Sequence, residues 1–103
     1  MPVKVLEQQI VKSIIEYLTL KRIFHYRQNS GAFQTATGGF YRMGVVGMPD
    51  IVAVRDGKYI GIEVKVPGKK QNPNQVEFQR KLEKAGGVYL LVTSVEEVVG
   101  YFV

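Results

Sequence analysis

The sequence predicts an α/β fold in which helices flank a mixed β-sheet, in the element order α-β-β-β-α-β-α. Three observations predict it. Apolar residues recur at helical spacing over residues 3–20, residues 51–66 have the pattern of a β-hairpin around Asp-Gly, and an Asn-Pro pair at residues 72–73 opens a second helix. Helical segments on both sides of predicted strands favour a sheet with helices packed on it. At 103 residues, with 46% hydrophobic and 22% charged residues, the chain is expected to form one domain over residues 1–103.

The first helix is expected over residues 3 to about 20. Its apolar stripe consists of Val3, Leu6, Ile10, Ile14, Tyr17 and Leu18. A short strand is expected over residues 23–27. A loop rich in Gly, Ser, Thr and Asn follows over residues 28–39, and then another short strand over residues 40–43.

The second half of the chain contains clear helix signals. Asn72 and Pro73 suit the N-cap and first position of a helix that runs to about Ala85, where two glycines end it. Residues 88–92 are apolar and predict a buried strand. Ser94, with Glu97 three residues later, predicts a capping box that opens a last short helix.

The composition excludes several classes of site. The absence of cysteine excludes a disulfide framework, an iron–sulfur cluster and a thiolate zinc site, and the single histidine, His25, is too little for a His-rich metal centre. Any bound metal would have mostly oxygen ligands, which favours Mg²⁺ or Mn²⁺. Charges within residues 1–12 argue against a signal peptide or a membrane span, so a cytoplasmic location without a membrane partner is expected.

Basic residues are concentrated in two stretches without acids. The net charge is +5, and no acid occurs between Glu16 and Asp50 or between residues 64 and 76. These stretches hold Lys21, Arg22, Arg27, Arg42, Lys65, Lys69 and Lys70. Clustered Lys and Arg bind a nucleic-acid backbone, whereas a merely solvated basic surface is the alternative.

The predicted hairpin places two acidic residues close together. Its Asp56-Gly57 pair fits a two-residue type I′ turn, which pairs Arg55 with Lys58 and places Asp50 opposite Glu63. Like charges directly opposite each other destabilise a sheet. A splayed strand end, a bulge that shifts the register, a shared proton, or a divalent cation bound by both carboxylates would each resolve the conflict.

Lys65 belongs to the same face of the predicted strand. Side chains alternate along a strand, so Glu63 and Lys65 share the face of Asp50, while residues 60, 62 and 64 point to the other. An acid–acid–lysine cluster is thus expected, with a plain salt bridge between Lys65 and Glu63 as the alternative reading.

These motifs resemble a known family. Pro49-Asp50 followed by Glu63-Val64-Lys65 resembles the PD-(D/E)xK nuclease core, which implies a restriction-endonuclease-like core. More closely, GMPD (residues 47–50), IEVK (62–65), NPNQ (72–75) and RQNSG (27–31) resemble the VRR-NUC domain. The resemblance runs over almost the whole chain.

The resemblance implies roles for individual residues. Asp50, Glu63 and the backbone carbonyl of Val64 would hold Mg²⁺ or Mn²⁺, and Lys65 would stabilise developing negative charge or orient the attacking water. Gln75 would position Lys65 or the water, although Gln at the third position of a helix is also favoured for capping.

Glu7 matches the acid of the family's first helix and would bind a second metal or a metal-bound water. By helical periodicity it falls within the apolar arc of its helix, where an acid is costly unless it is paired. A Glu at the edge of the stripe that reaches water is the alternative.

The implied function is a metal-dependent, structure-selective DNA endonuclease. Stand-alone VRR-NUC-like proteins resemble small viral and phage members, which act as homodimers with Holliday-junction resolvase character; for a phage protein the location would be the host cytoplasm. Candidate contacts to DNA phosphates are Arg27, Asn29, Lys69 and Lys70. A nuclease acting on flaps or other DNA ends, and a non-catalytic DNA-binding module, are the alternatives, and residues 40–48 could serve as core or as dimer surface.

Overall fold

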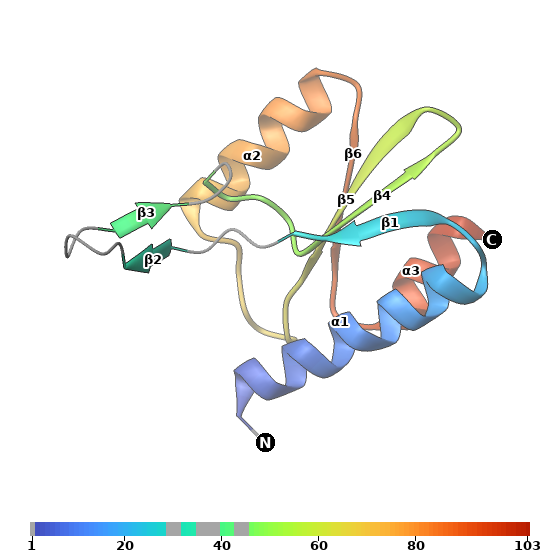
Figure 1. Cartoon of the computed structure of the whole chain (residues 1–103), viewed down its shortest axis with the longest axis horizontal. Helices are drawn as coiled ribbons and strands as arrows, with labels where there is room; N and C mark the ends of the chain where they lie inside the picture. Colours follow the sequence, from blue (N-terminus) through green and yellow to red (C-terminus); the bar gives the residue numbers. More distant parts are fainter. Residues whose placement is uncertain (1, 29–31, 35–39, 43–45) are drawn as a thin grey trace.

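The computed structural model describes residues 2–28, 32–34, 40–42 and 46–103. Within these ranges the elements are α1 (Val3–Leu20), β1 (Phe24–Arg27), β2 (Ala32–Gln34), β3 (Phe40–Arg42), β4 (Ile51–Arg55), β5 (Lys58–Val64), α2 (Pro73–Lys84), β6 (Val88–Val92) and α3 (Val95–Phe102) (Figure 1).

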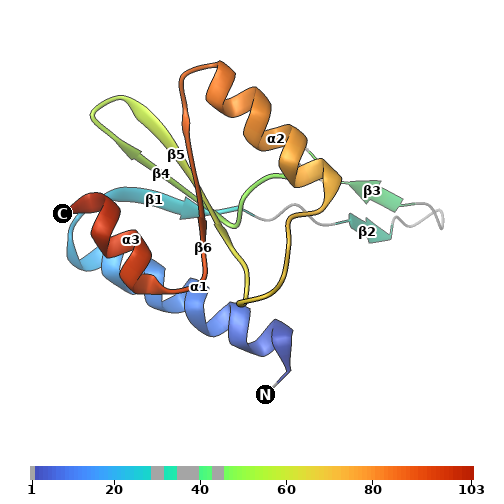
Figure 2. The same ribbon diagram turned by 180° about the vertical axis from the view of Figure 1, so that it is seen from behind.

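Four of the strands form one mixed sheet, as the sequence predicts. The strand order is β1-β4-β5-β6, with β1–β4 and β4–β5 antiparallel and β5–β6 parallel. Parallel neighbours need a crossover connection, and α2 supplies it between β5 and β6 (Figures 1 and 2). An α/β fold with a mixed sheet and flanking helices is therefore confirmed.

The central hairpin has the predicted register. Arg55 pairs with Lys58, and Ile51 pairs with Ile62. Asp56 and Gly57 have φ angles of 54° and 76°, the two positive values that a type I′ turn requires. The ladder ends at Ile51, so Asp50 lies in a bend directly before β4.

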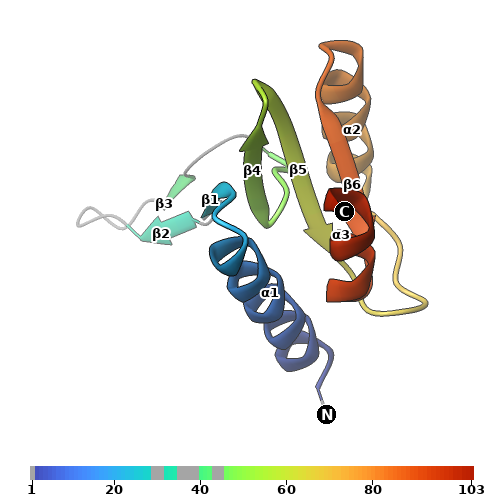
Figure 3. The same ribbon diagram turned by 90° about the vertical axis from the view of Figure 1, so that its right-hand side faces the viewer.

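One face of the sheet carries the hydrophobic core. Helices α1 and α3 pack against each other and against this face (Figure 3). The core includes Val11, Ile14, Leu18, Ile51, Ala53, Ile60, Ile62, Val64, Val92, Val98 and Phe102. Residues 60, 62 and 64 share it as the alternation of β5 predicts, and Glu63 therefore points to the opposite face.

Gly61 lies on that opposite face, where Pro49 packs over it and leaves no room for a side chain. A Cβ added at Gly61 would lie 2.8 Å from Pro49 Cγ, and Pro49 is itself buried. We expect Gly61→Ala to lower the free energy of unfolding by about 1–3 kcal/mol, since the proline ring cannot rotate away. Urea denaturation measures this. The control is Gly100→Ala in α3, where an added Cβ meets nothing within 4 Å, so unchanged or slightly raised stability is expected. Equal stability of Gly61→Ala and wild type would contradict the packing argument.

Two local predictions are wrong. The predicted loop over residues 28–39 contains β2, which pairs with β3 (Ala32 opposite Arg42) in a separate two-stranded sheet. The described part of the chain therefore has six strands, five of them before α2, instead of the predicted order α-β-β-β-α-β-α. A loop-like composition reports local turn tendency, whereas β2 exists through its pairing with β3. The capping box at Ser94 is also wrong, because Ser94 makes no side-chain cap; instead Glu97 accepts hydrogen bonds from the amide and hydroxyl of Thr93.

The side chains of residues 29–45 lie outside the described part of the chain. The predicted role of residues 40–48 as core or dimer surface falls largely on these side chains. Among the described helices, none is both long and apolar enough to cross a membrane.

Candidate active site

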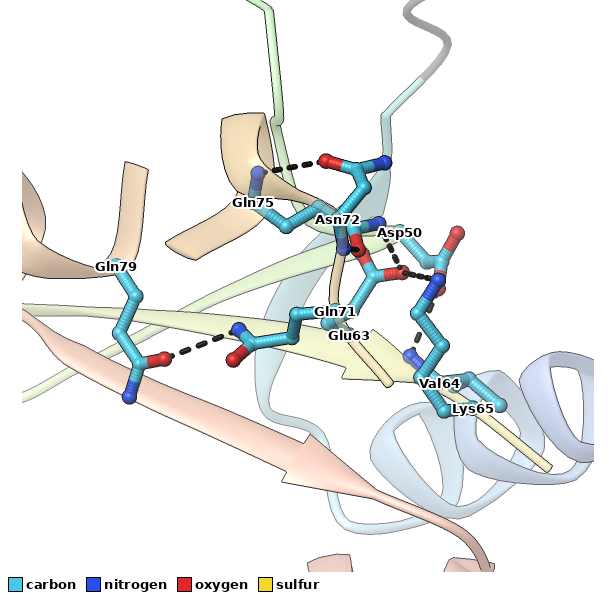
Figure 4. A network of polar contacts seen from close by, with 8 residues as sticks. All are labelled: Asp50, Glu63, Val64, Lys65, Gln71, Asn72, Gln75 and Gln79. Carbon is cyan, nitrogen blue, oxygen red and sulfur yellow. Dashed lines mark hydrogen bonds and ion pairs between the residues drawn. The ribbon is translucent and has the colours of Figure 1, made fainter. Parts of the chain in front are cut away.

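The structure brings Asp50 and Glu63 together at the end of the central hairpin. The backbone N–H of Val64 donates to Asp50 Oδ2 at 2.8 Å, so the Asp50 side chain turns toward the end of β5 (Figure 4). Glu63 is buried although it points away from the hydrophobic core, with 4% of its surface exposed. The predicted approach of the two acids is therefore present, although Asp50 lies just outside the regular ladder.

Lys65 and Gln75 both approach one oxygen of Glu63. Gln75 Nε2 donates to Glu63 Oε2 at 2.9 Å, and Lys65 Nζ lies 3.9 Å from the same oxygen (Figure 4). The Lys65 side chain is 18% exposed, which is low for a lysine. The structure thus joins four predicted site residues in one cluster.

Gln75 has two roles at once. Its amide oxygen accepts from the N–H of Asn72 and its own N–H donates to Asn72 Oδ1, both at 2.9 Å, which forms the capping box of α2. The NH₂ group of the same side chain holds Glu63. The capping role that the sequence predicts for Gln75 is therefore confirmed, and its contact with Glu63 ties the start of α2 to the acid pair.

A second contact ties α2 to the segment before Asp50. Gly47 has a φ of +85°, and a Cβ there would collide with the backbone carbonyl of Asn74. Only glycine allows this approach without strain. The turn that leads into Pro49 and Asp50 thus runs directly against the first turn of α2.

The acids face a cavity of about 210 Å³ at the end of the sheet. Its lining includes Glu7, Arg27, Asp50, Glu63, Val64 and Lys65. The N-terminal half of α1 forms one wall, and Glu7 is only partly exposed there, as its place in the apolar arc predicts. Lys4 and Gln8 also line the cavity but were not singled out from the sequence. Lys4 lies three residues before Glu7, and residues three apart share a helix face, so this spacing could have identified Lys4 from the sequence. Gln8 directly follows Glu7.

Burial and like charge perturb both carboxyl groups. Burial and, after it, the neighbouring Asp50 carboxylate raise the pKa of Glu63 from 4.5 to about 8, against the lowering effect of Lys65. Burial also raises the pKa of Asp50, against the lowering effect of the Val64 amide. Without a cation, Glu63 is therefore largely protonated at neutral pH.

The donor set fits a hydrated divalent cation rather than a closed cage. Among the described residues, no group of three or more His, Cys, Asp or Glu side chains is arranged to hold a metal ion. Glu7 therefore lies at the cavity wall and not in a three-carboxylate cage with Asp50 and Glu63. Mg²⁺ usually keeps several waters and is held by one or two carboxylates, and the buried Glu63 with the half-buried Asp50 meets that requirement.

The predicted phosphate contacts are spread over the molecule. Arg27 lines the cavity, and Lys69 and Lys70 are exposed in the segment between β5 and α2. Asn29 lies outside the described residues. Of these candidates, the structure places Arg27 beside the acids, where it acts to lower the pKa of Asp50.

A scan against models of known protein families found no match to this chain, and a search of curated proteins found no match either.

Proposed function

We propose that this protein is a Mg²⁺- or Mn²⁺-dependent DNA endonuclease that resembles the VRR-NUC domains of the PD-(D/E)xK nucleases. One observation carries the proposal: the half-buried Asp50 and the buried Glu63 are held together, with Lys65 and Gln75 on the Glu63 carboxylate. Burying two acids side by side is unfavourable in a protein that gains nothing from them.

Asp50, Glu63 and the backbone carbonyl of Val64 would hold the cation, with Glu7 binding a second ion or a bound water from the α1 wall. When bound, the cation would polarise the phosphate and lower the pKa of a water molecule. The raised pKa of Glu63 fits this role, because the cation would replace the proton that otherwise neutralises the pair.

The other residues act on the phosphodiester directly. Lys65, a compact cation at the cavity wall, would stabilise the negative charge that develops on the phosphate oxygens or orient the attacking water. Water attacks phosphorus, the bond from phosphorus to one sugar oxygen breaks, and a phosphate end and a hydroxyl end result. Gln75 is a positioning residue, since it fixes Glu63 Oε2. Arg27 would contact a neighbouring phosphate.

The preferred substrate in this proposal is branched DNA, a four-way junction in particular. A homodimer would place two active sites about a two-fold axis and cut the junction symmetrically. A flap or DNA-end nuclease is the second candidate, favoured by the exposed aromatic residues described below. The proposed location is the cytoplasm, that of the host cell if the protein is phage-encoded.

The test compares wild type, Lys65→Met and Lys58→Met on labelled four-way junctions, flaps and duplex, with Mg²⁺, Mn²⁺ or EDTA. Lys58 is the control, since it is an exposed lysine in the hairpin turn outside the cavity. Wild type and Lys58→Met are expected to cleave with metal and not with EDTA. Lys65→Met is expected to cleave about 10²-fold more slowly or worse.

Tight binding by all three proteins without cleavage in any metal would refute the nuclease and leave a DNA-binding module. Equal cleavage by Lys65→Met and wild type would refute the role of Lys65.

A further inference from the structure

Aromatic side chains lie exposed on the same sheet face as the acid pair. Phe24 is 67% and Tyr26 47% exposed, although both belong to a strand of the main sheet. Their rings pack edge to face with centroids 6.3 Å apart. Two exposed, mutually oriented rings on a strand are unusual, since large aromatic residues normally contribute to a core.

The pairing of strands sets where these rings lie. Phe24 pairs with Val54 and Val54 with Tyr59; one step along, Tyr26 pairs with Val52 and Val52 with Gly61. Paired residues share a face, so each set forms a row across the sheet. The next row on this face contains Gln28, Asp50 and Glu63. The backbone N–H of Gln28 donates to the backbone carbonyl of Asp50, and Glu63 follows on the next strand.

The row of Tyr26 therefore lies two residues, roughly 7 Å, along the sheet from the row of the acids. Successive phosphates of an extended nucleic-acid strand are separated by a similar distance. A strand whose phosphate reaches Asp50 and Glu63 can thus place a neighbouring base over Tyr26, and the next over Phe24.

Tyr59 forms the inner wall of this surface. It is half-buried, and its hydroxyl accepts a hydrogen bond from Gln28 Nε2 at 3.3 Å. Burial and, after it, the nearby Tyr26 raise the pKa of Tyr59. A separate cavity of about 380 Å³ lies between Tyr59 and Leu82, near the end of α2, and Phe24 and Tyr26 are not part of its lining.

The surface suits nucleic acid better than a second copy of the chain. Phe24 and Tyr26 together offer roughly 250 Å² of accessible surface, far below the about 800 Å² that each partner buries in a stable interface. Val52, which belongs to the row of Tyr26, is fully buried, so the exposed part of that row is aromatic rather than aliphatic. Exposed cations precede and end β1, with Lys21 and Arg22 before it and Arg27 at its end, although Arg27 belongs to the other face of the sheet.

We propose that this surface, the aromatic shelf of Phe24, Tyr26 and Tyr59, binds unpaired nucleotides next to the cleavage site by stacking bases on Phe24 and Tyr26. Aromatic side chains beside a basic groove bind single strands without sequence preference, because every base has a π-face. The inference rests on the proposed nuclease function and narrows it to DNA with an unpaired segment beside the cut, such as a flap or an opened junction.

The experiment uses the whole protein in EDTA, where binding is measured without cleavage. Short single strands and flaps carry 2-aminopurine in the unpaired segment, whose fluorescence falls when the base stacks on an aromatic ring. The variants are Phe24→Ala, Tyr26→Ala, the double variant and the conservative Tyr26→Phe. Tyr101→Ala is the matched control, because Tyr101 is 42% exposed but lies on α3.

Wild type, Tyr26→Phe and Tyr101→Ala are expected to quench the fluorescence. Each alanine variant should bind the single strand roughly five- to one-hundredfold more weakly, with weaker quenching and little change in affinity for plain duplex. Circular dichroism confirms that the exposed substitutions leave the fold intact.

Unchanged quenching and affinity in the double variant would overturn the inference while leaving the nuclease intact. Loss of a dimer in that variant, seen by sedimentation, with unchanged single-strand binding would also overturn it and assign the rings to a subunit interface. If the alanine variants lose the quenching while wild type cleaves no DNA, the result would instead support base stacking on the aromatic shelf and refute the nuclease.

Discussion

Asp50→Asn is expected to slow metal-dependent cleavage about 10³-fold or more, the several kcal/mol that a bound cation contributes to a phosphoryl transition state. Asn keeps an oxygen that can accept the hydrogen bond from the Val64 N–H, so the bend before β4 should persist. What it lacks is the negative charge. The loss should therefore appear in the reaction and in cation affinity, not in the fold.

Single-turnover cleavage rates with Mg²⁺ measure the effect. The matched control is Asp56→Asn, because the Asp56 side chain is 95% exposed in the hairpin turn. Asn-Gly suits a type I′ turn as well as Asp-Gly, so this control should keep full activity and stability. If Asp50→Asn cleaved at the wild-type rate, the acid pair would not be the metal site.

Glu63→Gln is expected to stabilise the metal-free protein increasingly as the pH rises. The folded pKa of Glu63, about 8, exceeds its ordinary value of 4.5, so between these values the folded protein binds more protons than the unfolded chain. Stability is then fully present below pH 4.5 and falls as the pH rises, by up to about 1.4 kcal/mol per unit for one group. Glutamine does not titrate and escapes this loss.

Urea denaturation in EDTA between pH 5 and 9 measures the difference. The two proteins should differ little at pH 5, diverge up to about pH 8 and reach a gap on the order of 3 kcal/mol. Glu77→Gln is the control, because Glu77 is exposed, its pKa is lowered by Arg80, and no such gain with pH is expected. Saturating Mg²⁺ should stabilise wild type and not Glu63→Gln. A gap that is constant with pH would contradict the assignment.

The parts of the fold that local rules govern could be predicted from the sequence. Asp56 and Gly57 determine the turn, the turn determines the register, and the register places Asp50 near Glu63. The capping role of Gln75 follows from its distance to Asn72. Its contact with Glu63 depends on how α2 returns across the sheet; the resemblance suggested a site role for Gln75, with Lys65 or the water as its partner, and not this contact.

The parts that depend on contacts between distant segments could not be predicted. β2 forms by pairing with β3, and the residues around it have the composition of a loop. The exposure of the aromatic residues of β1 has no signal in the sequence, since most aromatic residues belong to a core. Their exposure depends on where α2 packs, against β6 at the opposite edge of the sheet.

Because the capping box of α2 holds Glu63 through Gln75, the acid pair can loosen while the rest of the domain stays folded. Helix ends open and close far more often than a whole domain unfolds, and each opening of the first turn of α2 would release Gln75 from Glu63. Mild heat, or urea too dilute to unfold the sheet, would therefore loosen the acid pair first. Activity should decline along such a titration before the circular dichroism of the sheet changes, so that the working range of the protein is narrower than its range of folding.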